Sequence, residues 1–249
     1  NLNKLGFSQN EIRAFNAWED RAVYRCGKLH RIFNPTSDIC LLGDDLGGDR
    51  VLLLGNSHAD SIKVTFQESM EDNGITTFFY VANNPLMSSA QNANRIFNEV
   101  IENRIDAVII HYSPSFYDND AHQIEMTSFV DLMDDINISV QFIAPVPVYD
   151  YHIPKAMIAL IREPSSHLTS VNYESYQLTA QSFYKFISEN TISSEHVFYP
   201  HEIFCSGSEC EFQSEGVPYY FDSEHLTLTG AARLQTLFNK VAVQIISSR

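Results

Sequence analysis

Positive charge is scarce in this chain. Its 249 residues include 16 Lys and Arg against 31 Asp and Glu, which gives a formal net charge of −15. Nucleic-acid binding relies on clustered Lys and Arg that neutralise phosphates, so this balance excludes a nucleic acid as the partner. The same deficit argues against docking on an anionic lipid surface.

Long hydrophobic runs are also missing. The longest aliphatic stretches, such as residues 51–54 and 108–110, are far shorter than the roughly 20 apolar residues that cross a bilayer as a helix. Hydrophobic residues nevertheless make up 44% and aromatic residues 12% of the chain, so a sizeable core can be buried. We expect a globular domain that handles small molecules, sugars or other proteins.

Cysteine is rare, and its four positions fall into two close pairs. Cys26 and Cys40 lie 14 positions apart, and Cys205 and Cys210 lie 5 apart. Neither pair has the CxxC spacing of a zinc site, and Gly207 suits a tight loop closed by a disulfide. We predict the disulfides 26–40 and 205–210, and hence an oxidising compartment. Four reduced, buried cysteines are the alternative.

Short apolar runs alternate with stretches of helical periodicity from residue 51 onward. The runs predict buried strands at 51–54, 75–81, 107–110, 140–144 and 196–199. The stretches between and after them predict helices over 59–72, 90–103, 122–135, 173–189 and 229–246. This alternation is typical of an α/β fold, a three-layer α/β/α sandwich with a mostly parallel central sheet.

The first 48 residues have a different character, so we divide the chain into an N-terminal extension, 1–48, and a main domain, 49–249. In the extension, Ser8 and Glu11 have the spacing of a capping box. They predict a helix that runs to about Tyr24, with loop and turn after it.

The carboxyl end of the first strand is where an open α/β sheet binds its ligands, and here it reads Gly55-Asn-Ser-His58. Gly55 permits a tight turn, and Ser57 then begins a helix with its hydroxyl exposed. Such a serine suits a nucleophile, because N–H groups at the start of a helix stabilise a developing oxyanion. The alternative is a serine that merely caps the helix.

A serine nucleophile needs a base, and the segment before the last predicted helix offers one. Asp222 and His225 are three positions apart. At that spacing one turn lets the carboxylate fix the tautomer of the imidazole, while the other ring nitrogen faces the nucleophile. The alternative is an Asp that caps a turn beside a surface histidine.

Taken together, Gly55-Asn-Ser57 and Asp222-Ser-Glu-His225 resemble the motifs of the SGNH (GDSL-type) hydrolase superfamily. The longer strings at 53–60 and 222–231 look like the SGNH domain fused to bacterial acyltransferase 3 membrane proteins. Those proteins are O-acyltransferases that modify envelope polysaccharides such as lipopolysaccharide O-antigen. The resemblance implies Ser57 as nucleophile, His225 as base and Asp222 as orienting carboxylate, on a mostly parallel five-stranded sheet.

The resemblance also implies partners and a location. A membrane domain outside this chain would bring the acyl group across the inner membrane, and the present domain would pass it to a glycan hydroxyl in the periplasm. Residues 1–48 would belong to the linker between the two domains. The reaction needs no cofactor, and we expect no metal site.

The sequence departs from the family pattern around the oxyanion hole. Asn56 stands where family members usually carry Asp, and residues 76–205 include no glycine and no G-x-N-D motif. The Ser57 N–H is therefore the expected donor, and loss of one such donor costs about 10²–10³ in rate. Further candidates for this role or for substrate contact are Asn56 at the turn itself, Asn83 and Asn84 after the second strand, and His111 at the end of the third.

Aromatic residues follow strands three and four, namely Tyr112, Phe116, Tyr117, Tyr149 and Tyr151. They suit either a sugar ring or packing under loops. Three functions remain open at this point: acyl transfer to a glycan, hydrolysis of a carbohydrate O-acetyl ester by the same triad, and a catalytically weak glycan-binding module.

Overall fold

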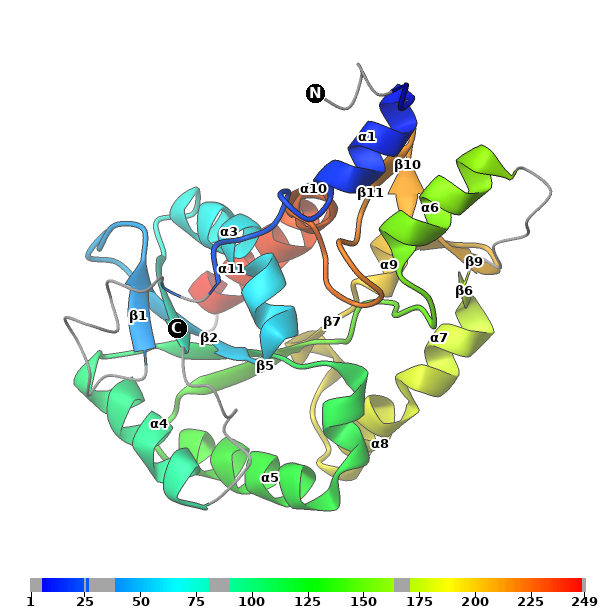
Figure 1. Cartoon of the computed structure of the whole chain (residues 1–249). Helices are drawn as coiled ribbons and strands as arrows, with labels where there is room; N and C mark the ends of the chain where they lie inside the picture. The colour runs from blue at the N-terminus through cyan, green and yellow to red at the C-terminus, as the bar shows by residue number, and fades with distance from the viewer. Residues whose placement is uncertain (1–5, 25, 27–38, 81–89, 164–170, 248–249) are drawn as a thin grey trace.

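The computed structural model describes residues 6–24, 26, 39–80, 90–163 and 171–247. A six-stranded sheet of order β1-β3-β2-β4-β5-β7 forms the centre (Figure 1). Its five parallel strands are β2 (Arg50–Gly55), β3 (Thr76–Tyr80), β4 (Ala107–His111), β5 (Ser139–Ile143) and β7 (Val197–Phe198). The parallel sheet predicted from the apolar runs is confirmed.

The edge strand β1 (Ile39–Leu42) lies where a loop was predicted, and it pairs antiparallel with β3. Ile39 and Cys40 are buried, whereas Leu41 is 41% exposed. An edge strand has one neighbour and needs few buried positions, so its sequence signal is weak.

Helices cover both faces of the sheet (Figure 1). On one face lie α3 (Ser57–Glu71), α10 (Leu228–Ala232) and α11 (Gln235–Ser247); on the other lie α4 (Ala90–Glu102), α5 (Asp120–Asp135) and α8 (Gln181–Glu189). In β2, Val51 and Leu53 pack toward the first face, and Leu52 and Leu54 toward the second. A strand buried on both sides must be apolar at every position, which explains the Val-Leu-Leu-Leu run.

Two helices differ from the prediction. The capping box of Ser8 and Glu11 is present, but α1 (Gln9–Asn16) ends well before Tyr24. The segment around Pro154 lies outside the predicted helices, yet it begins α6 (Ile153–Arg162). Proline is favoured in the first turn of a helix, where its missing N–H has no acceptor in any case.

Short elements complete the fold. They are β6 (Val171–Asn172), α7 (Tyr173–Thr179), α9 (His201–Phe204), β8 (Cys205–Ser206), β9 (Glu209–Cys210), β10 (Gln213–Ser214), β11 (Val217–Pro218) and the 3₁₀ turns η3 (Pro114–Asp118) and η4 (Ser194–His196). The predicted helix over 173–189 is thus divided into α7 and α8, and the last predicted helix into α10 and α11.

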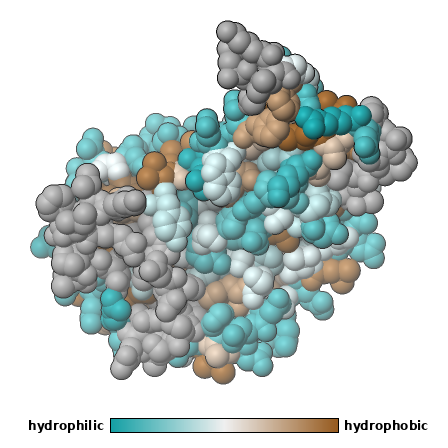
Figure 2. Space-filling model, viewed as in Figure 1, coloured by the Kyte–Doolittle hydropathy of each residue, from teal (hydrophilic) through white to brown (hydrophobic). Residues whose placement is uncertain are grey.

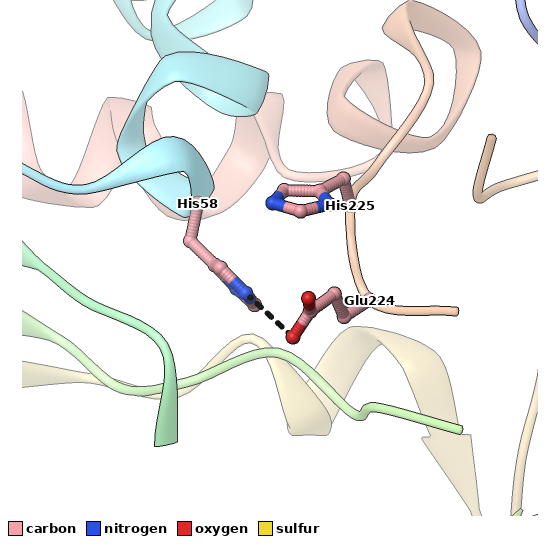
Figure 3. A group of neighbouring side chains, drawn as sticks. All are labelled: His58, Glu224 and His225. Carbon is pink, nitrogen blue, oxygen red and sulfur yellow. Dashed lines mark ion pairs between the residues drawn. The ribbon is translucent and has the colours of Figure 1, made fainter. Parts of the chain in front are cut away.

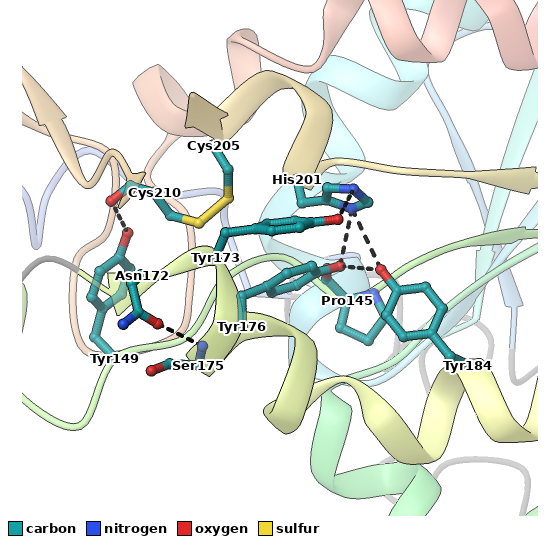
Figure 4. The surroundings of a disulfide bond; sticks show 10 residues. All are labelled: Pro145, Tyr149, Asn172, Tyr173, Ser175, Tyr176, Tyr184, His201, Cys205 and Cys210. Carbon is teal, nitrogen blue, oxygen red and sulfur yellow. Dashed lines mark hydrogen bonds between the residues drawn. A yellow bond between two sulfur atoms is a disulfide. The ribbon is translucent and has the colours of Figure 1, made fainter. Parts of the chain in front are cut away.

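The structure contains both predicted disulfides, Cys26–Cys40 and Cys205–Cys210. The second closes the β8–β9 hairpin, in which Gly207 adopts a φ of 63° that favours glycine. Around it, the hydroxyls of Tyr173 and Tyr176 meet the two ring nitrogens of His201, at 3.4 and 3.2 Å (Figure 4). This polar cluster fixes the hairpin against α7.

The surface is mixed in hydropathy. On the face shown in Figure 2, hydrophobic residues occur in small groups among hydrophilic ones. None of the helices in the described part of the chain has the length and hydrophobicity that a bilayer crossing requires.

Candidate active site

Strand β2 ends at Gly55, and Ser57 begins α3 at the carboxyl edge of the sheet. Gly55 lies opposite His111 in the β2–β4 ladder, and a Cβ atom on Gly55 would lie 1.9 Å from the His111 carbonyl oxygen. The glycine was predicted to permit a tight turn. Its φ is not among the positive values, so the structure requires it for the close approach of two strands.

Asn56 caps α3 and ties it to the segment after β4. Its Oδ1 accepts hydrogen bonds from the N–H groups of His58 and Ser113, at 3.1 and 3.3 Å, and its Nδ2 donates to Ser113 Oγ at 2.9 Å. The amide therefore positions the turn that carries Ser57. As the first residue of α3, Ser57 has an N–H without an acceptor in the preceding backbone of the helix.

Ser57, His225 and Asp222 form a continuous hydrogen-bonded chain. Ser57 Oγ lies 2.7 Å from His225 Nε2, and His225 Nδ1 lies 2.7 Å from Asp222 Oδ2. Because a carboxylate accepts, Nδ1 carries the proton and Nε2 is free to accept the serine proton. The structure brings together the three residues that the sequence motifs had linked, across 168 positions of sequence.

The loop of Asp222 and His225 is held rigidly. Asp222 Oδ1 accepts from the backbone N–H groups of Glu224 and His225, at 2.9 and 2.8 Å. The Asp222 and Ser223 carbonyls accept from the N–H groups of Ile153 and Tyr149. The Tyr149 hydroxyl also donates to the Cys210 carbonyl at 3.2 Å, so the disulfide hairpin is linked to this loop.

These contacts shift the pKa values of the pair. Burial lowers the pKa of His225, but the hydrogen bond and negative charge of Asp222, with the charge of Glu224, outweigh it and raise the pKa above its usual 6.5. Burial raises the pKa of Asp222, yet the hydrogen bonds from His225 and from two backbone N–H groups bring it to about 2. Asp222 is thus ionised at neutral pH and stabilises the charged imidazolium.

A cavity of about 650 Å³ opens beside Ser57 and His225. One wall comes from Ser57, Asp60, Ser61, Phe221 and the Asp222–His225 pair, and a second wall from Trp18, Glu19, Arg21, Ala22, Val23 and Tyr24. The sequence prediction missed the second wall. The periodicity after α1 indicated more helix, and no local signal marks a contact between residues 18–24 and a loop two hundred positions later.

Comparison with known proteins shows to which family the chain belongs. Residues 25–240 match the family model described as "SGNH domain (fused to AT3 domains)". The chain belongs to this SGNH-domain family. The match covers most of the sequence, and it confirms the resemblance inferred from the two end motifs.

One of the solved structures compared shares the fold of this SGNH domain, and another is a weaker match. The periplasmic domain of a lipopolysaccharide acetyltransferase from Salmonella ser. Paratyphi A has a TM-score of 0.62 and 15% sequence identity, covering 94% of this chain and 95% of that one. A G-D-S-L family protein from Desulfitobacterium hafniense has a TM-score of 0.47 and 11% identity, covering 78% of this chain and 99% of its own. No curated protein matches the chain in sequence.

A second histidine lies behind the triad of the SGNH domain. His58 is 1% exposed, its ring centre is 5.0 Å from that of His225, and its Nε2 lies 3.5 Å from Glu224 Oε2 (Figure 3). Burial lowers the pKa of His58, and the Glu224 carboxylate opposes this effect. His58 is therefore a neutral, buried histidine that packs against His225.

These residues also have the chemistry of metal ligands. His58, Glu224 and His225 can each offer one ligand atom, and the three atoms lie within 4.8 Å of one another. Both ring nitrogens of His225 are already engaged, at 2.7 Å each, by Ser57 and Asp222. A metal ion at this place would compete with the triad for its base.

The remaining candidates lie elsewhere. His111 is fully buried and its Nδ1 bonds to the Ile143 carbonyl at 3.1 Å, so it does not line the cavity as predicted; burial also lowers its pKa to about 3. Asn83 and Asn84 lie outside the described residues. Of the aromatic residues expected near a sugar, Tyr112, Phe116, Tyr117 and Tyr149 are buried and Tyr151 is partly buried against the core. Packing explains all five.

Proposed function

We propose that this SGNH domain is an O-acyltransferase that moves an acyl group, most simply acetyl, to a hydroxyl of a bacterial envelope glycan through an acyl-Ser57 intermediate. The observation that carries the proposal is the 2.7 Å contact of Ser57 Oγ with His225 Nε2, backed by the 2.7 Å contact with Asp222. A serine with this partner set at a helix start has the chemistry of an activated nucleophile.

The reaction has two half-steps. Ser57 Oγ gives its proton to His225 Nε2 and attacks the donor ester carbonyl, and the developing oxyanion is stabilised by the Ser57 N–H. His225 then returns the proton to the leaving alkoxide, which leaves acyl-Ser57. In the second half-step a sugar hydroxyl gives its proton to His225 and attacks the acyl carbon, and the proton passes back to Ser57 Oγ.

Two observations support the setting of this reaction. The family is described as fused to AT3 domains, which supports an acyl donor supplied by an attached membrane domain. The two disulfides of the structure require an oxidising compartment, which supports a periplasmic site of action.

Hydrolysis is the second candidate, and one observation favours it. Ser57 is exposed to solvent in the described structure. Water can therefore reach the acyl carbon and replace the sugar hydroxyl in the second half-step. The domain would then act as a carbohydrate O-acetyl esterase with the same three residues.

The test uses the purified protein with p-nitrophenyl acetate. We expect release of nitrophenol and an acetyl adduct in the intact mass, with no adduct on Ser57→Ala and turnover about 10²–10⁴-fold slower for His225→Ala. Ser128→Ala, which removes an exposed hydroxyl on α5, is the matched control and should behave as wild type. An adduct that survives in Ser57→Ala refutes the proposed nucleophile. Adding de-O-acetylated polysaccharide then separates transfer from hydrolysis.

A further inference from the structure

The second wall of the cavity is a separate structural feature, which we call the strap and define as residues 18–24. Most of its residues line the same cavity as Ser57 and His225. Three of its large hydrophobic side chains are strongly exposed: Trp18 by 54%, Val23 by 74% and Tyr24 by 61%. Exposed apolar side chains that gather beside a cavity mark a binding surface.

Fixed contacts hold the strap in place. The Asp20 carbonyl and Oδ2 accept from the N–H groups of Leu228 and Thr229, at 2.9 and 3.2 Å, at the start of α10. The Val23 carbonyl accepts from Lys63 Nζ of α3. Just beyond the strap, the Cys26–Cys40 disulfide ties the chain to β1. The wall is therefore preorganised, which reduces the entropy lost when a ligand binds.

An aromatic surface leads from the strap to the base. The Trp18 ring meets Phe221 edge-on with centres 5.8 Å apart, and Phe221 stacks on His225 at 5.5 Å with an interplanar angle of 9°. The Arg21 guanidinium lies over the indole, 3.8 Å from its centre. A ligand resting on this surface lies beside the nitrogen that takes the acceptor proton.

The charged side chains that line the cavity favour a neutral ligand over an anionic one. Asp60 is paired with Lys63, and Asp222 with His225. Within the described part of the chain, no ion pair holds Glu19 or Arg21, so one acceptor and one donor group face the cavity. A carboxylate and a guanidinium together suit neutral hydroxyls, whereas the net charge of −15 repels an anionic sugar.

We propose that the strap is the acceptor seat of the enzyme and that it binds a neutral pyranose. The apolar face of the ring packs against the part of the Trp18 and Phe221 surface that Arg21 and His225 leave open, and its hydroxyls bond to Glu19 and Arg21. This inference rests on the proposed function, since it names the substrate class of that same site. It also explains how a solvent-exposed serine favours a sugar over water: a seated sugar displaces water from the cavity.

Trp18 is the sole tryptophan of the chain, so its fluorescence reports directly on the strap. We would titrate wild type and Ser57→Ala with methyl α-D-glucopyranoside, methyl α-D-galactopyranoside and the charged methyl α-D-glucuronide. We expect a saturable change in emission with at least one neutral glycoside, equal in both proteins, and weaker binding of the glucuronide. Arg21→Ala should raise the Kd of the neutral glycoside about tenfold.

Arg104→Ala is the matched control, because Arg104 is an exposed arginine before β4, at the opposite edge of the sheet. It should bind like wild type. Trp18→Ala and Trp18→Phe add a kinetic readout: the ratio of glycan transfer to hydrolysis should fall in the first and recover in the second. No saturable change with any neutral glycoside, equal or tighter binding of the glucuronide, or an unchanged Kd in Arg21→Ala overturns the seat. If the wild-type protein binds the neutral glycoside but forms no acyl adduct, the proposed function is refuted and the proposed binding of the sugar by the strap still holds.

Discussion

Replacing Gly55 by Ala tests the link between strand packing and the position of Ser57, the proposed nucleophile. The added Cβ would lie 1.9 Å from the His111 carbonyl oxygen and 2.7 Å from Ala59 Cβ. Real Cβ atoms almost never approach other heavy atoms within 3.0 Å, so β2 and the start of α3 must move by about 1 Å. The backbone oxygen of β4 cannot rotate away as a flexible side chain could.

The magnitude follows from that movement. Overpacking of this kind costs about 3 kcal/mol, which lowers Tm by roughly 6–12 °C for a domain of this size. A shift of about 1 Å also breaks the hydrogen bond of Ser57 Oγ with His225, and misplacement on that scale costs on the order of 10² in rate. We expect Gly55→Ala to lose both stability and kcat/KM toward p-nitrophenyl acetate.

Gly74→Ala provides the matched control at the other end of α3. Gly74 has a φ of 74°, and a Cβ atom added to it would have nothing within 4 Å, so alanine there costs about 1–2 kcal/mol through backbone strain alone. Tm should fall while kcat/KM stays at the wild-type value. If Gly55→Ala keeps wild-type kcat/KM, the argument that this glycine positions Ser57 is wrong.

Three further predictions concern protonation and the disulfide hairpin. The charge of Glu224 helps to raise the pKa of His225, so Glu224→Gln should move the acid limb of the kcat/KM profile to lower pH; an unchanged limb contradicts this. Burial holds the pKa of His111 at about 3 against its usual 6.5, so the folded state loses stability below pH 6.5, by about 2 kcal/mol at pH 5. Urea unfolding should show this loss in wild type and less of it in His111→Gln, and equal losses would refute it. The double variant Cys205→Ser/Cys210→Ser should lose about 2 kcal/mol of unfolding free energy, and unchanged urea midpoints would contradict that value.

Much of the sheet could be predicted because burial leaves a direct mark on sequence. Residues 51–54 are apolar at every position, since β2 has a helix layer on each side. The edge strand β1 carries a weaker pattern, because Leu41 faces solvent. Helix α6 was not predicted, because a proline such as Pro154 occurs both in the first turn of a helix and in a rigid loop.

The candidate site divides in a similar way. Two short motifs made it possible to predict Ser57, Asp222 and His225. One motif marks the start of a helix at Ser57, and the other places Asp222 and His225 one turn apart. Trp18 and Arg21 could not, because their contacts depend on how the chain returns to the cavity after folding. Local sequence does not encode a contact between residues 20 and 229.

The Cys26–Cys40 disulfide gives the site a dependence on maturation. Asp20 and Val23 hold the strap by hydrogen bonds, whereas its downstream end is secured by a covalent bond to β1. That bond forms only where thiols are oxidised. A newly made chain in a reducing compartment therefore contains Ser57, Asp222 and His225, but the wall of the cavity formed by the strap lacks its covalent bond to β1. Oxidation forms the Cys26–Cys40 bond and so secures this wall. The compartment in which the protein matures therefore also determines where the cavity reaches its final structure.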